Sequence, residues 1–229
     1  MKINLSYQTM QVPPPFAMAY TLSIDIKETC QISLNIEYLD REELEEDEIY
    51  DEGFTLDDDF EWKGELGENW AEAIENFFKD VTISPNSEDL NHWLYVEIAD
   101  GINTTNGHIA NPEKHLNFLQ QIIQACFEKA KREAPLKLDL IIVADGTKSN
   151  FKAKASFVER AFTINDKAKT WSDLERLMGI LYLDEPEATK PAKNPNKEGY
   201  WIDYTAEGLY FKMKKLKEDK KKLLNEIIS

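Results

Sequence analysis

A chain of 229 residues, 42% of them hydrophobic and 31% charged, has the composition of an ordinary globular protein, which excludes a fibrous or largely disordered chain. The 43 acidic and 27 basic residues give a net charge of −16. They are unevenly placed: residues 1–100 hold 5 basic and 25 acidic residues, and residues 101–229 hold 22 and 18. The acidic half repels nucleic-acid phosphates and anionic lipid headgroups, so we expect no binding to nucleic acid or to a membrane.

The cysteines and the apolar runs indicate a cytoplasmic protein. Cys30 and Cys126 form no CxxC motif or Cys/His cluster, so we expect reduced, structural thiols. The N-terminus lacks the run of about 7–15 apolar residues that a signal peptide requires. The longest aliphatic stretch, residues 140–144, is far shorter than the ~18 residues of a membrane span.

Three stretches near the N-terminus alternate apolar and polar side chains with a period of two: residues 2–8, 20–26 and 32–38. Half-buried strands give this pattern, because successive side chains emerge on opposite faces of a sheet. Only a few residues join the second and third stretches, which makes these strands antiparallel. The sequence therefore predicts a three-stranded antiparallel meander with one face in water.

The remainder of the chain alternates predicted helices and strands. We expect helices over 69–79, 111–133, 172–182 and 209–228, and strands over 92–98, 138–144 and 153–164. The fold class is therefore α+β: an N-terminal antiparallel three-stranded meander extended by further strands, helices packed mainly on one face, and a C-terminal amphipathic helix. We expect residues 1–183 to form a single globular domain, with 184–229 adding a Pro/Lys-rich loop and a C-terminal helix that packs on it.

The predicted C-terminal helix carries apolar residues at alternating steps of four and three: Leu209, Met213, Leu216, Leu223 and Ile227, with Lys220 interrupting the series. Such a seam docks either on the protein's own core or on a partner, which could be a second copy of the chain. Both a monomer and a homodimer therefore remain open.

Residues 40–61 form an acidic segment with 13 Asp or Glu among 22 residues, interspersed with aromatic side chains. A purely solvating acidic tract usually lacks aromatics, so we expect this one to fold onto the body of the protein. A non-catalytic protein-binding module that uses residues 40–68 to engage a basic protein partner is the favoured interpretation. Tyr50, Phe54 and Trp62 are the candidate anchors, and the candidate rim charges are Asp57, Asp58 and Asp59. A solvated acidic loop without function is the simpler alternative.

A second interpretation is a divalent-metal-dependent hydrolase or nuclease. In an extended stretch Asp57, Asp59 and Glu61 would share one face and present oxygen ligands to Mg²⁺ or Ca²⁺; no other cofactor is expected. Glu61 and Lys63 have the spacing of the ExK half of a metal-dependent nuclease site, and Asp40 could supply the second acid. The chain has no nucleophile elbow, phosphate-binding glycine loop or dinucleotide fingerprint, which weighs against an enzyme.

Overall fold

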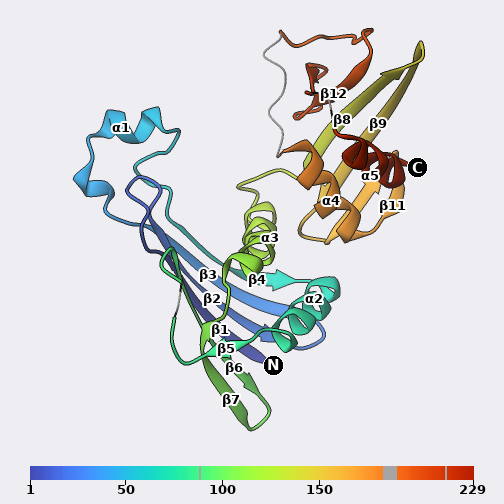
Figure 1. The fold of residues 1–229 in the computed structure, drawn as a ribbon. Coiled ribbons are helices and arrows are strands. Elements are labelled where there is room, and N and C mark those ends of the chain that lie inside the picture. The colour runs from blue at the N-terminus through green and yellow to red at the C-terminus, as the bar shows by residue number, and fades with distance from the viewer. Residues whose placement is uncertain (88, 183–189, 215) are drawn as a thin grey trace. The chain divides into compact units, whose positions relative to one another are not determined.

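The computed structural model describes residues 1–87, 89–182, 190–214 and 216–229 (Figure 1). It divides into two compact units, Met1–Arg132 and Glu133–Ser229. Each unit contains one antiparallel sheet with helices, which confirms the α+β class. Whether residues 1–183 fold cooperatively as one domain stays a prediction, and the predicted loop over 184–199 falls partly outside the described residues. No helix in the described ranges is long and apolar enough to cross a membrane.

The first unit holds a seven-stranded sheet in the order β4-β3-β2-β1-β6-β7-β5. Its strands are β1 (Lys2–Thr9), β2 (Met18–Ile26), β3 (Cys30–Tyr38), β4 (Phe60–Leu66), β5 (Ile83–Ser84), β6 (His92–Asp100) and β7 (Asn103–Ile109). Its helices are α1 (Glu46–Asp51), α2 (Glu68–Lys79) and α3 (Glu113–Lys129), with a short 3₁₀ turn at Arg41–Glu43. The first three strands form the predicted meander.

One face of this sheet carries the core of the unit. Leu5 pairs with Leu22 and Leu22 with Leu34, so that three leucines, each at most 2% exposed, stand in one row across the strands. Figure 1 shows α2 and α3 on the same side of the sheet, and Cys126 of α3 is completely buried, as is Cys30 of β3. Both thiols are free, and burial raises the pKa of Cys30 to about 11.

The second unit holds a six-stranded sheet in the order β11-β10-β9-β8-β12-β13. Its strands are β8 (Leu136–Ala144), β9 (Thr147–Ser156), β10 (Ala161–Ile164), β11 (Lys167–Lys169), β12 (Gly199–Asp203) and β13 (Phe211–Lys212). The helices α4 (Trp171–Leu181) and α5 (Glu218–Ile228) pack against each other. The apolar run of β8 supplies both faces: Leu138 and Leu140 join the core with the helices, while Ile141 and Val143 pack with Trp201.

The prediction of a helix over 209–228 is wrong in its first half. The helix α5 begins only at Glu218, and residues 211–212 form β13, which pairs with β12. The carboxylate of Asp203 accepts hydrogen bonds from the backbone N–H groups of Thr205, Gly208 and Leu209. These bonds fold residues 203–209 into a turn, so the predicted helix does not begin at Leu209. Part of the predicted seam still packs inside its own unit: Met213, Leu216 and Ile227 are at most 3% exposed. Leu223 is only partly buried and Leu209 is 39% exposed, whereas Leu224, which was not in the predicted seam, is fully buried.

The register of the meander can be tested by truncating two neighbouring side chains of β3. Leu34 is fully buried, so Leu34→Ala should lower the free energy of unfolding by roughly 2–5 kcal/mol in urea titrations. Ser33 lies on the opposite face and is only half-buried, so Ser33→Ala should change stability by less than about 0.5 kcal/mol. Equal losses for the two variants would contradict the register.

Candidate partner-binding site

The acidic segment forms a lobe at one end of the first sheet. The strands β1 and β3 end there and β2 and β4 begin there, so the connections 10–17 and 39–59 lie together; we call these two connections the acidic lobe. A backbone hydrogen bond of 2.9 Å from the N–H of Leu39 to the carbonyl oxygen of Ala17 joins them. Figure 1 shows α1 standing on the outer part of the longer connection.

The guanidinium of Arg41 lies at the centre of the lobe and is only 9% exposed. Its Nη1 donates to the carbonyl oxygen of Thr55 and to Oδ2 of Asp58, both at 2.7 Å. Its Nε and Nη2 donate to the carbonyl oxygen of Pro15 at 3.4 Å, in the other connection. The guanidinium carbon also lies 3.9 Å from the centre of the Tyr38 ring. One buried cation therefore ties the two connections to the end of β3.

Asp58 is the anion that compensates this cation. Its carboxylate accepts hydrogen bonds from the N–H and the hydroxyl of Thr55 as well as from Arg41. Burial acts to raise the pKa of Asp58, but the hydrogen bonds from Thr55 and Arg41 outweigh it and hold the pKa below its ordinary value. The side chain is only 18% exposed, so the main role of Asp58 is to hold the lobe together from within.

Asp59 is also used within the fold. Its Oδ1 accepts a 2.8 Å hydrogen bond from the N–H of Tyr38, which fixes the entry into β4 next to the end of β3. Arg132, which follows α3, donates to the carbonyl oxygens of Asp58 and Asp59 at 3.2 and 3.3 Å. These contacts give the carboxyl end of the acidic segment a defined conformation.

Five large apolar side chains of the lobe nevertheless face solvent: Met10, Val12, Phe16, Tyr50 and Leu56. Phe16 is 45% exposed, Tyr50 is 50% exposed and Leu56 is 53% exposed. Phe54 is half-buried and packs edge-on against Phe16, with ring centres 5.3 Å apart. The exposed acids of the same lobe include Glu46, Asp47, Asp51, Glu52 and Asp57. An exposed apolar group rimmed by charges is typical of a surface that binds another protein.

Phe16, Leu56 and Arg41 are residues of this site that sequence analysis did not identify. A signal was present for Arg41, since it is the only basic residue between positions 40 and 61. A lone cation inside a dense run of acids is a natural partner for one of them.

Trp62 lies elsewhere, in β4. It is directly opposite the buried Leu34 and therefore on the inward face of the sheet, and it is half-buried. Its indole covers Gly64, where a Cβ atom would overlap the ring. Trp62 thus packs against its own sheet, and any contact of this side chain with a partner stays a prediction.

The three residues proposed as metal ligands are not gathered into a site. Asp57 is exposed, Asp59 is bonded to the backbone of β3, and Glu61 pairs with Lys63 at 3.2 Å, with both side chains well exposed. Asp40 precedes the 3₁₀ turn in a left-handed conformation with φ 59°. Across the parts of the chain that the structure describes, no group of three or more His, Cys, Asp or Glu is placed to hold a metal ion.

The neighbours Asp57 and Asp58 provide a matched test of this description. Asp58→Asn leaves the buried guanidinium of Arg41 without its counter-charge and should lower the free energy of unfolding by about 2–3 kcal/mol at pH 7. Asp57→Asn removes the same charge from an exposed side chain and should leave stability unchanged or slightly increased.

The stabilisation that Asp58 provides should depend on pH. A carboxyl whose pKa is lowered by folding stabilises the protein above its unfolded-state pKa, here near 3.8, and loses that contribution as the pH falls through the folded-state pKa. The stability difference between the wild type and Asp58→Asn should therefore shrink as the pH is lowered through this region, as urea titrations at a series of pH values would show. An equal loss in the two variants at pH 7 would contradict the internal role of Asp58.

Comparisons of the chain with protein-family models, with curated proteins and with solved structures found no match. The chemistry of the acidic lobe follows from its own charge, exposure and contacts.

Proposed function

We propose that the protein is a non-catalytic binding protein whose acidic lobe engages a basic protein partner. The observation that carries the proposal is the exposure of Phe16, Tyr50 and Leu56 on a lobe held by Arg41 and surrounded by carboxylates. A merely solvated acidic loop gains nothing from exposed apolar side chains. Nor does it need a buried cation to hold it in shape.

The apolar and the charged residues have different roles in the proposed complex. Burying one half-exposed Phe, Tyr or Leu contributes on the order of 1–2 kcal/mol, so Phe16, Tyr50 and Leu56 would supply most of the affinity. Exposed carboxylates such as Asp51 and Asp57 would speed the encounter with a basic surface and reject acidic ones. Because Arg41 fixes the lobe in advance, binding costs less conformational entropy.

This proposal revises the residues chosen from the sequence. Tyr50 and Asp57 remain candidates for direct contact, and Phe54 supports Phe16 from below the surface. Asp58 and Asp59 act by shaping the lobe, as their hydrogen bonds indicate. A cytoplasmic location and the absence of nucleic-acid binding remain part of the proposal, and the metal-dependent hydrolase is the less favoured function because its acids are dispersed.

The proposal can be tested by salt-graded retention of proteins from native lysate on the immobilised protein, followed by binding kinetics with the retained partner. The variant Phe16→Ser/Leu56→Ser should raise the dissociation rate about tenfold or more, because apolar anchors act in the bound state. Replacing Asp51, Glu52 and Asp57 by their amides should instead slow association and flatten its salt dependence.

The matched control for the charge variant replaces Glu68, Glu72 and Glu113, three exposed acids of the same unit outside the lobe, by Gln. It removes the same charge from helices α2 and α3 and should leave both rates nearly unchanged. Retention of no protein at low salt would sink the proposal, and so would equal effects of the two charge variants.

A further inference from the structure

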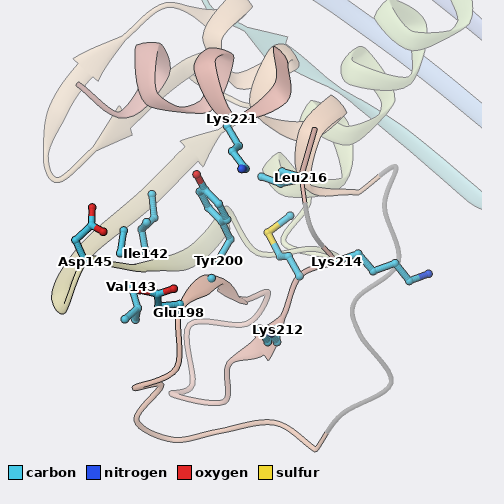
Figure 2. A pocket seen from close by; sticks show the side chains of 12 residues that line it. Ile142, Val143, Asp145, Glu198, Tyr200, Lys212, Lys214, Leu216 and Lys221 are labelled. Atoms are coloured by element: carbon cyan, nitrogen blue, oxygen red, sulfur yellow. The ribbon is translucent and has the colours of Figure 1, made fainter. Parts of the chain in front are cut away.

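The second unit contains an open pocket of about 570 Å³ (Figure 2). Its lining residues include members of β8, β12, β13 and α5, together with Met213, Lys214 and Leu216. The volume lies within the range of pockets that hold small molecules, about 300–1,000 Å³. None of its lining residues belongs to the acidic lobe.

One side of the pocket is apolar. Ile142 and Tyr200 are directly opposite each other in the β8–β12 ladder and therefore share a face of the sheet. Met213 and Leu216, which are 3% and 2% exposed, form the adjoining wall. The backbone N–H of Met213 donates to the carbonyl oxygen of Tyr200 at 2.8 Å, so this wall is fixed to the strand.

Two polar groups of the pocket, one from a lysine and one from a tyrosine, approach each other. Figure 2 shows the ammonium group of Lys221 and the hydroxyl group of Tyr200 pointing toward one another, from α5 and from β12. Lys221 also forms an ion pair of 2.6 Å with Glu218, but the Glu218 side chain is 87% exposed and can turn into water when another anion takes its place.

The lining of the pocket carries charges of both signs. Lys212, Lys214 and Lys221 line it together with Asp145 and Glu198, and Figure 2 shows the ammonium group of Lys214 directed away from Tyr200 and Lys221. Lys221 is therefore the cation placed to meet an anion beside the hydroxyl of Tyr200. Gly199 contributes to the lining: it has φ +135°, and a Cβ atom there would lie 3.1 Å from Cε of Lys212, so glycine lets the lysine chain pass close to the strand. The second unit as a whole has 18 basic and 16 acidic residues, whereas the first has 9 and 27.

We infer that this pocket binds a small organic anion. A carboxylate or phosphate group would bridge Nζ of Lys221 and the hydroxyl of Tyr200, and an apolar body would lie against Ile142, Met213 and Leu216. Lysine suits this task because its compact charge and three donors accommodate either anion without a fixed geometry. The inference is independent of the function proposed for the acidic lobe, because the two sites use different residues of different units.

Titration of the full-length protein with phenyl phosphate, followed by NMR or calorimetry, tests the inference. Phenyl phosphate should bind saturably, and it should bind at least about tenfold more tightly than inorganic phosphate or phenol, because neither of these uses both halves of the pocket. Lys221→Gln should weaken binding about tenfold, and Lys221→Arg should restore part of the loss. Tyr200→Phe, which keeps the ring and removes only the hydroxyl, should weaken it several-fold.

Lys222→Gln is the matched control, since Lys222 is the next residue of α5, is exposed and does not line the pocket. It should bind phenyl phosphate as the wild type does. Equal weakening by Lys221→Gln and Lys222→Gln would show general attraction to the lysines of α5 and overturn the inference. Absence of saturable binding would overturn it too, as would equal affinity for inorganic phosphate. If Lys221→Gln unfolds the protein, as circular dichroism would reveal, Tyr200→Phe decides the outcome alone.

Discussion

Arg41 is the buried guanidinium on which the shape of the acidic lobe depends. Moving such an ion out of water costs several kcal/mol unless its donors are used and its charge is compensated. In the lobe, the donors of Arg41 are used by the carbonyl oxygens of Pro15 and Thr55 and by Asp58. Its charge is compensated by the carboxylate of Asp58 and by the ring of Tyr38. The contacts reach residues 15, 38, 55 and 58, so one side chain connects both loops of the lobe to the end of β3. A lysine could not replace it, because a single ammonium group lacks the planar set of five donors and stacks poorly on a ring.

The lobe shows how an acidic segment can be ordered despite its own repulsion. Thirteen carboxylates within 22 residues repel one another, and this repulsion opposes compact structure. Several carboxylates are used within the fold: the partly buried Asp58 pairs with Arg41, and the exposed Asp59 accepts a hydrogen bond from the N–H of Tyr38. The capping box of α1 uses Glu45 and Glu48 in the same way. The other acids point into water, where screening limits the cost, and the exposed aromatic and aliphatic residues lie among them.

The strands were predictable because a period of two is a local property. The alternation over residues 20–26 and 32–38 places Leu22 and Leu34 on one face, and the structure pairs them. Residues 60–66 alternate in the same way, with Phe60, Trp62 and Leu66 on the inward face. The charged residues between them hid this pattern, so Trp62 was not predicted to face inward. Composition alone could not say which of three consecutive aspartates turns inward, because that choice depends on Arg41 and Thr55 in three dimensions.

The helix predicted over 209–228 was too long for a related reason. The 4-3 spacing from Leu209 to Ile227 is real, and most of these residues are buried, but a short strand and a turn meet the same burial requirement as a helix. The deciding interaction is the carboxylate of Asp203, which binds three backbone N–H groups up to six residues away. Such a side-chain to backbone bond competes with helix formation and leaves only a faint trace in the hydrophobic pattern.

The unequal charge of the two compact units makes ionic strength a variable that acts on one part of the chain more than on the other. The first unit has 18 more acidic than basic residues, and the second has two more basic than acidic ones. Dissolved salt shortens the reach of repulsion to about 10 Å at 0.1 M. Salt therefore weakens a large repulsion between like charges in the first unit and only a small one in the second. Added salt should consequently stabilise the first unit more than the second.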